Sequence, residues 1–194
     1  MGKATGPTFR VPYRRRRENR TNYKKRLALI KSGISRFVVR QTNKKILVHF
    51  VNFDVKGDKT LVSADSSELE SKGWMPQANT PSAYLTGALA AKKAISAGVK
   101  KAHLDIGMAT ATKGRILFAA AIGAKDAGLE IDIDKSVVDE ARINGTHISE
   151  YAKKLESEDK AKYEQYFARY TKRKIDVKNL PAVFEKTREA ILSG

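Results

Sequence analysis

The residues with the most distinctive chemistry lie near the amino terminus, where four consecutive arginines, Arg14 to Arg17, stand among further cations. An arginine guanidinium is a planar fork that donates paired hydrogen bonds to phosphate or carboxylate oxygens. Residues 1–45 hold 15 Lys and Arg against a single acid, Glu18. This segment therefore predicts a surface that binds a polyanion, which could be a nucleic acid, an anionic membrane or an acidic protein.

Aromatic and amide side chains are interleaved with these cations, and this favours RNA over a membrane. Tyr13, Asn22 and Tyr23 are of the types that stack on bases or bond to sugar hydroxyls. A basic helix that binds a membrane surface has a continuous apolar face, which the segment from Arg14 to Lys25 lacks. For the four arginines alone, a nuclear localisation signal or a solvated basic tail is the alternative.

The positive charge is concentrated in this arm. The 194-residue chain has 38 Lys and Arg against 21 Asp and Glu, a formal net charge of +17. Residues 1–45 carry a net +14, residues 46–150 carry −1 and residues 151–194 carry +4. The early arm has too few apolar residues to form a core, so we expect it to be extended or disordered when free. A short helix is expected from about Glu18.

The elements that must position the arm begin near residue 34. Three β-type runs separated by short turns predict an antiparallel meander. The pattern then changes to helix, strand, helix and strand, which requires parallel pairing through right-handed crossovers. The expected elements are strands at 36–40, 46–53 and 60–64, a helix from its N-cap Thr80 to Ala97, a strand at 102–106, a helix from Lys113 to Ala127 and a strand at 129–133. The fold class is therefore α/β, with a mixed sheet on which helices pack.

The C-terminal third, from residue 136, is expected to be helical. Ser136 and Asp139 predict a capping box, the segment 157–159 predicts another helix start, and Pro181 begins a last helix. The domains are thus a basic arm at 1–33, an α/β body at 34–135 and a helical extension at 136–194. Trp74, between the meander and the first long helix, is expected to anchor a loop.

An aromatic stripe marks one face of an extension helix. Tyr163, Tyr166, Phe167 and Tyr170 recur at helical spacing. Two interpretations stay open: the stripe packs on the body, or it docks on a neighbouring protein or RNA. The cations at 172–174 suit the dipole at the end of that helix, so they need not bind RNA.

The composition excludes several classes of function. The chain has no Cys, which excludes a disulfide scaffold, a cysteine zinc site and a thiol nucleophile. It has no apolar N-terminal segment typical of a secretory signal and no apolar run long enough to span a membrane. We expect no membrane partner, no metal and no cofactor.

Two other functions are alternatives to an RNA-binding scaffold. A metal-dependent nuclease would need clustered carboxylates, and Asp105, Asp132 and Asp134 are the candidates. They form no recognisable acid triad, and the favoured explanation is that they are polar residues on the solvent-facing side of a strand. A general nucleic-acid chaperone would bind DNA and any RNA with equal affinity.

Three segments together resemble a known family: the arm from Tyr13 to Leu27, the strand from Arg36 to Arg40, and the segment from Gly107 to Leu129. They are similar to the universal large-subunit ribosomal protein eighteen family in its archaeal and eukaryotic form. The resemblance covers nearly the whole chain, and the region after about residue 136 is similar to the extension that bacterial members lack. It implies a mixed α/β scaffold in the cytoplasmic ribosome without catalytic activity. It also implies three partners: 5S ribosomal RNA, the large-subunit RNA in the central protuberance and neighbouring ribosomal proteins.

The same resemblance nominates RNA-binding residues in the arm, on the first strands and near a helix start. For the residues at the helix start, free N–H groups would also favour phosphate, and a solvated first turn is the alternative. The nominated residues are Arg14, Arg15, Arg16, Arg17, Arg20, Asn22, Tyr23, Lys24, Lys25, Arg26, Arg36, Arg40, Lys44, Lys113 and Arg115.

Overall fold

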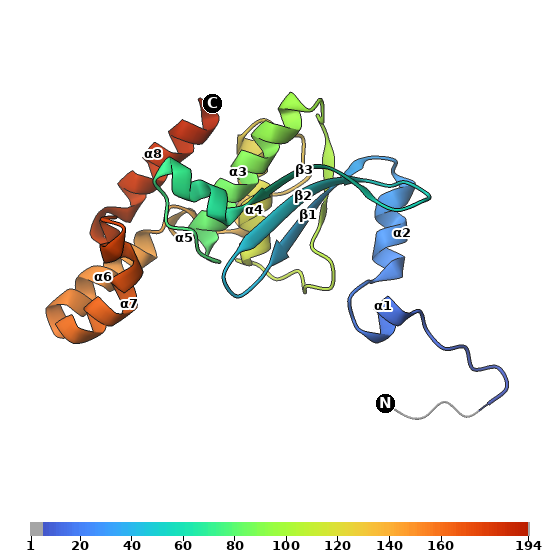
Figure 1. The fold of residues 1–194 in the computed structure, drawn as a ribbon, viewed down its shortest axis with the longest axis horizontal. Coiled ribbons are helices and arrows are strands. Elements are labelled where there is room, and N and C mark those ends of the chain that lie inside the picture. Colours follow the sequence, from blue (N-terminus) through green and yellow to red (C-terminus); the bar gives the residue numbers. More distant parts are fainter. Residues whose placement is uncertain (1–5, 194) are drawn as a thin grey trace.

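A mixed sheet forms the centre of the molecule (Figure 1). The computed structural model describes residues 6–193, and these form a sheet with the strand order β3-β2-β1-β4. β1 pairs antiparallel with β2 and parallel with β4, and β2 pairs antiparallel with β3. The strands are β1 (Ser35–Gln41), β2 (Ile46–Asn52), β3 (Lys59–Asp65) and β4 (Ala102–Asp105). The predicted meander and the α/β class are confirmed.

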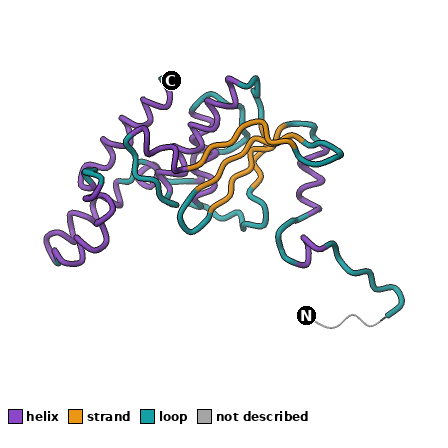
Figure 2. Tube along the Cα trace, in the orientation of Figure 1, coloured by secondary structure: helices purple, strands orange, loops and turns teal. Residues whose placement is uncertain are grey.

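Two long helices, α3 (Thr80–Ser96) and α4 (Ile116–Asp126), cover one face of the sheet (Figure 2). α3 begins one residue earlier than expected: Asn79 rather than Thr80 is its N-cap, and Pro81 is the second helical residue rather than the first. The Asn79 side chain accepts a hydrogen bond from the Ser82 N–H at 3.0 Å, which satisfies a donor that the first turn leaves free. A Cβ atom at Gly87 would overlap the carbonyl group of Ala120. The backbones of α3 and α4 are therefore in direct contact at this glycine.

The expected strand at 129–133 is wrong. Glu130 makes an isolated parallel bridge with Lys101, and the Ile133 N–H then bonds back to the Ile131 carbonyl at 3.1 Å. That bond bends the chain out of the extended conformation that a strand needs. Ile131 and Ile133 are nevertheless buried. The alternation therefore reflects the burial of every second side chain and not pairing in a sheet.

The C-terminal third is helical, as predicted. Three short 3₁₀ helices accompany the α-helices of the described residues, the first of them following β3. The elements are η1 (Ser66–Lys72), η2 (Lys135–Val137), α5 (Glu140–Ile143), α6 (Thr146–Glu158), α7 (Lys160–Lys172), η3 (Val177–Asn179) and α8 (Leu180–Leu192).

The helix caps of this region differ in part from those predicted. The capping box from Ser136 to Asp139 is wrong, because the two residues belong to different elements. Asp134 caps η2, which contains Ser136, whereas Asp139 precedes α5 and makes no side-chain cap bond. The helix start predicted at 157–159 is right only at its last residue: Asp159 is the N-cap of α7 and accepts a hydrogen bond from Lys162 N, whereas Ser157 and Glu158 still belong to α6.

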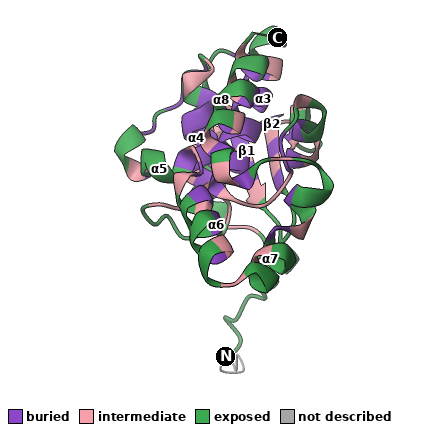
Figure 3. Ribbon diagram, turned by 90° about the vertical axis from the view of Figure 1, so that its left-hand side faces the viewer, coloured by how far each residue is buried: buried purple, intermediate pink, exposed green. Residues whose placement is uncertain are grey.

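The hydrophobic core passes without a break from the sheet into the C-terminal helices (Figure 3). Trp74 is 1% exposed, and its Nε1–H donates to the Ser82 hydroxyl at 2.8 Å. Its ring meets that of Phe184 in α8 with the centroids 6.0 Å apart. The expectation that Trp74 anchors a loop is confirmed, and the indole also joins the body to the extension.

The aromatic stripe of α7 divides between the core and the surface. Phe167 and Tyr170 are buried, and Tyr163 packs against the core in a partly buried position. Tyr166 is 59% exposed. The interpretation that the stripe packs on the body therefore holds for three of its four rings.

The arm leaves the sheet at the end opposite the C-terminal helices (Figure 1). It contains α1 (Arg14–Arg17) and α2 (Tyr23–Lys31). The expected short helix is present as α2, but it begins at Tyr23 rather than at about Glu18, because Glu18 ends α1 and Asn19 then adopts a positive φ of 52°. Among the described residues no helix has the length and apolar character to cross a membrane.

Candidate nucleic-acid interface

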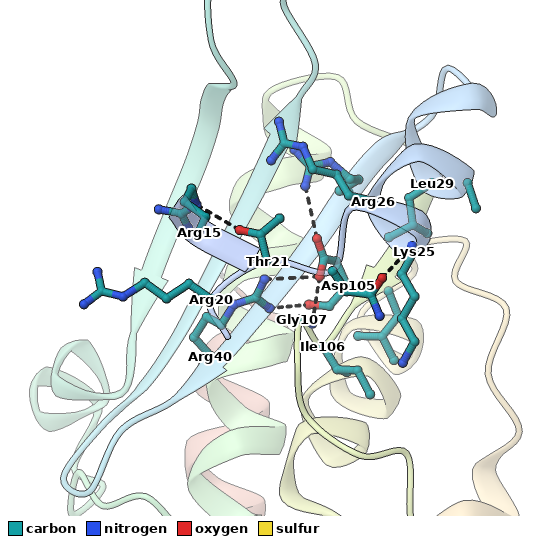
Figure 4. Close-up of a pocket in the computed structure, with 14 residues that line it drawn as sticks. Arg15, Arg20, Thr21, Lys25, Arg26, Leu29, Arg40, Asp105, Ile106 and Gly107 are labelled. Atoms are coloured by element: carbon teal, nitrogen blue, oxygen red, sulfur yellow. Dashed lines mark hydrogen bonds and ion pairs between the residues drawn. The ribbon is translucent and has the colours of Figure 1, made fainter. Parts of the chain in front are cut away.

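A cavity of about 370 Å³ lies between the arm and the sheet (Figure 4). The α1–α2 segment, β1 and the chain that follows β4 enclose it. Its charged lining consists of six cations and one carboxylate: Arg15, Arg20, Lys25, Arg26, Arg36, Arg40 and Asp105. A cavity with such an excess of donors is suited to bind an anion.

Local hydrogen bonds fix the arm side of this cavity. The Arg15 Nε–H donates to the Thr21 hydroxyl at 2.8 Å, which ties α1 to the loop before α2. Asn22 caps α2 by accepting a hydrogen bond from Lys25 N at 3.1 Å. The rings of Tyr13 and Tyr23 meet with their centroids 5.3 Å apart and tilted by 55°. The two helices of the arm are thus joined by two side-chain contacts.

Asp58, in the turn between β2 and β3, connects the arm to the sheet. Its two carboxylate oxygens accept from Arg26 of α2 at 2.9 Å and from Arg36 of β1 at 2.6 Å. The position of α2 against the sheet therefore depends on a carboxylate that one residue of each element shares.

Asp105, at the end of β4, binds the two arginines of β1. It accepts from Arg36 and from Arg40 at 3.1 Å each, and its backbone carbonyl accepts from Arg40 at 2.6 Å. The Gly107 N–H donates to the same carboxylate at 2.8 Å. A Cβ atom on Gly107 would lie 2.9 Å from the Arg40 guanidinium carbon, so glycine makes room for this packing.

These contacts lower the pKa of Asp105. Burial alone would raise it by opposing ionisation. The charge of Arg40 and the hydrogen bonds from Gly107, Arg40 and Arg36 outweigh burial, so that the pKa of Asp105 lies below its ordinary value. Asp105 is therefore a carboxylate at neutral pH and holds both arginines by charge-assisted bonds.

The pairing leaves part of the cationic lining available. Arg36 is 4% exposed, and both of its terminal nitrogens are bound to carboxylates. Arg15, Arg20 and Lys25 are exposed. The contact of Arg20 with Glu18, at 3.3 Å on the surface, is of a kind that contributes little stability. Arg36 thus supports the cavity, and the exposed cations can bind a ligand.

The structure brings eight of the fifteen nominated residues together. Arg15, Arg20, Asn22, Lys25, Arg26, Arg36 and Arg40 line the cavity. Arg115 lines an adjoining hollow of about 280 Å³ that shares Arg20 and Arg40 with it. The others nominated in the arm lie on exposed parts of α1 and α2: Arg14, Arg16, Arg17, Tyr23 and Lys24.

Lys44 and Lys113 lie away from the cavity, and Arg115 lines only the adjoining hollow. Lys113 is exposed in the loop before α4, which begins at Ile116 rather than at Lys113. Arg115 is the N-cap of α4, but its side chain makes no cap bond and instead donates to the Thr110 carbonyl at 3.0 Å. Lys44 lies in the turn after β1, at the far end of the strand.

The residues that sequence reasoning missed are the partners of the cations. Asp58 and Asp105 form ion pairs with the arginines. Thr21 accepts a hydrogen bond from Arg15, and Gly107 leaves space for the Arg40 guanidinium. The only indication for Asp105 was its place at the end of a predicted strand. Asp58 had none beyond its place in a predicted turn.

A sheet with a cationic arm and cavity at one end, its arginines fixed by carboxylates, defines the class of basic scaffold that binds a polyanion. Residues 7–100 match the family described as ribosomal large subunit proteins 60S L5 and 50S L18. The large ribosomal subunit protein uL18 of Metallosphaera sedula is 45% identical over 192 residues, which are 98% of this chain and 98% of that protein. The uL18 protein of Halobacterium salinarum is 48% identical over 191 residues, 97% of this chain and 98% of that protein. The chain belongs to this family of large-subunit ribosomal proteins.

This membership confirms the family that the arm and strand motifs indicated. The chain is a structural protein of the ribosome and not an enzyme. The nuclease alternative built on Asp105, Asp132 and Asp134 is therefore set aside. In the structure, the Asp105 carboxylate forms ion pairs with Arg36 and Arg40.

Proposed function

We propose that the chain binds 5S ribosomal RNA and helps to attach it to the large-subunit RNA in the central protuberance. The observation that carries RNA binding is the cavity between arm and sheet, where six cations face one carboxylate. The choice of 5S RNA rests on the resemblance of the arm, the first strand and the Gly107–Leu129 segment to their family.

Two kinds of contact contribute to RNA binding, one mainly to affinity and the other to selectivity. Arm cations that neutralise phosphates release counterions, which supplies affinity without sequence selectivity. The paired rings of Tyr13 and Tyr23, 74% and 37% exposed, offer flat surfaces on which unpaired bases can stack. Selectivity for one folded RNA then comes from the fixed distance between these rings and the cavity.

The nominated arginines have two different roles in this proposal. Arg15, Arg20 and the exposed arginines of α1 contact phosphate directly. Arg36 contacts no RNA, because its guanidinium is buried between Asp58 and Asp105. It holds α2 and the end of β4 in place and so shapes the cavity for its ligand.

The test is the affinity of the purified protein for 5S RNA, transfer RNA and duplex DNA, titrated across salt. A variant with Arg14 to Arg17 all replaced by Ala should bind 5S RNA more weakly and flatten the log–log salt slope by about 3, since each phosphate contact contributes about 0.7 to 0.9. The control removes four exposed lysines outside the arm that make no ion pair among residues 6–193: Lys100, Lys153, Lys160 and Lys186 to Ala. Both variants lower the net charge by the same amount.

Preference for 5S RNA that survives high salt, together with a flattened slope in the arm variant alone, supports the proposal. Equal and salt-labile binding to all three nucleic acids would contradict it. An arm variant that behaves like the control would show that the arm is not the electrostatic contact.

A further inference from the structure

A second cationic groove lies at the opposite end of β1 from the arm. Two hollows, of about 410 and 240 Å³, open between the turn that follows β1 and α7, and both are lined by Lys44 and Arg169. The turn lies on the side of the sheet that faces the C-terminal helices, whereas the arm leaves from the other end (Figure 1). Residues far apart in the sequence therefore form one surface.

The groove carries an excess of unpaired positive charge. The larger hollow is lined by five cations and one carboxylate: Lys44, Lys45, Arg169, Lys172, Arg173 and Glu70. Arg173 pairs with Glu70 at 2.8 Å, and Lys45 makes a longer contact with Asp65 at 3.5 Å. Among the described residues, the exposed side chains of Lys44, Arg169 and Lys172 have no ion-pair partner. Like charges held close together favour the binding of a polyanion.

The elements that carry these cations are fixed to one another. In the turn, the Thr42 N–H donates to the Lys45 carbonyl, and the Thr42 hydroxyl accepts from Lys45 N, each at 2.9 Å. In α7, the buried Tyr170 donates its hydroxyl to Gln77 at 3.0 Å. The turn and α7 are thus already ordered in the free protein. Binding a ligand would therefore restrict little more than the ends of the lysine and arginine side chains, and would cost little conformational entropy.

We propose that this groove binds the phosphate backbone of a second RNA segment, distinct from the segment at the arm. The inference rests on the proposed function and deepens it. The groove is distinct from the arm cavity because the two share no lining residue: on β1 the cavity reaches as far as Arg40, whereas the groove begins in the turn, at Asn43 and Lys44. The protein would thus hold RNA at the arm cavity and at the groove and act as a bridge between two segments.

The lining favours RNA over an acidic protein. Protein interfaces are centred on buried apolar or aromatic anchors, whereas contacts to a nucleic-acid backbone come from cations and amides. Apart from the cations and Glu70, the two hollows are lined by Ser67, three amides and three apolar residues, and none of the apolar residues is aromatic: Met75, which is itself buried, Pro76 and Ala78. The amides are Asn43, Gln77 and Asn79.

The test uses a groove variant with Lys44→Gln, Arg169→Gln and Lys172→Gln. Its control carries Lys100→Gln, Lys153→Gln and Lys186→Gln, which removes the same charge from exposed positions outside the groove. Salt-titrated binding is measured separately with 5S RNA and with protein-free large-subunit RNA. We expect the groove variant, and not the control, to flatten the salt slope by about 2 for one of these RNAs.

The outcomes separate this inference from the proposed function. A flattened slope with either RNA supports the groove and identifies the RNA that it holds, even if wild-type protein shows no preference for 5S RNA. Slopes equal to those of the control for both RNAs would overturn the groove while leaving the arm result intact. Poly-glutamate serves as a third probe: loss of its binding in the groove variant, with RNA slopes unchanged, would assign the groove to an acidic protein and overturn the inference.

Discussion

At the scale of single residues, Asp105 determines whether the cationic cavity keeps its shape. It is 8% exposed and binds Arg36 and Arg40 through its carboxylate. Arg36 cannot reach water from its position, so losing this partner leaves a buried guanidinium with Asp58 alone. Breaking one side of a buried ion pair is costly because the other charge stays desolvated.

We therefore expect Asp105→Asn to lower the free energy of unfolding by about 3 kcal/mol at neutral pH. Urea unfolding followed by the fluorescence of the single tryptophan, Trp74, measures the change. The difference in unfolding free energy between the wild type and the variant should shrink as the pH falls. The pKa of Asp105 is lower in the folded than in the unfolded protein, where it is about 4. The stability that the carboxylate contributes is therefore fully present above pH 4 and is lost as the pH falls through the folded-state pKa. A difference that stays constant down to pH 2 would contradict this assignment. Asp132→Asn, at an exposed position, is the control and should change stability by less than about 0.5 kcal/mol.

At the scale of elements, the close packing of α3 on α4 depends on two glycines. A Cβ atom at Gly87 would overlap the Ala120 carbonyl, and one at Gly123 would overlap the carbonyl of Tyr84. Alanine normally stabilises a helix relative to glycine. At this contact we expect the steric overlap of the added Cβ atom to outweigh the gain in helix propensity, because the neighbouring atoms belong to the backbone and cannot rotate away.

Gly87→Ala should accordingly destabilise the protein by about 2 kcal/mol through overpacking. Ala182→Gly, at an exposed position in α8, tests helix propensity alone and should cost about 1 kcal/mol. Chemical denaturation of both variants measures the two effects. A Gly87→Ala protein more stable than the wild type would show that α3 and α4 can move apart at little cost.

The sequence predicted those elements whose pattern is local. The meander, the two long helices and the parallel β4 follow from apolar periodicity and from Gly and Pro at the element ends. The strand at 129–133 failed because alternation records burial, and whether a partner strand is in reach depends on the tertiary packing. Asn79 and Thr80 are both good caps, and the sequence alone does not decide between neighbours.

The candidate site could be predicted only in part. Its cations were visible as a basic run, but the burial of Arg36 was not, since a basic residue within a strand normally lies on the solvent-facing side. Its partners Asp58 and Asp105 lie 22 and 69 residues away along the chain. The groove at Lys44 was missed for the same reason, because Arg169 reaches it only through the packing of α7.

At the scale of the whole molecule, the sheet and the C-terminal helices share one core. Phe184 of α8 lies against Trp74 and Tyr84, with ring centroids 6.0 and 5.4 Å apart. The carbonyl of Leu192, at the end of α8, accepts from Lys92 of α3 at 2.6 Å. The body and the extension should therefore unfold together.

Phe184→Ala should cost about 3 to 5 kcal/mol by leaving a cavity in this core. It should shift the unfolding curves from Trp74 fluorescence and from circular dichroism by the same amount, since one cooperative unit gives coincident transitions. Tyr166→Ala, at the exposed ring of α7, is the control and should leave both curves nearly unchanged. Two separate transitions in the wild type would instead indicate that the extension folds by itself.

The exposure of the arm has a further consequence for copies of the protein that have not joined a ribosome. All four arginines of α1 are exposed, and the arm extends from the end of the sheet (Figure 1). Proteases that cleave after basic residues would find their sites there, on a segment with few contacts to protect it. Cleavage in α1 would spare the core, yet the remaining protein would have lost the cations that we propose contact RNA. Bound RNA would shield the same sites, so the arm would also determine how long an unassembled copy stays competent.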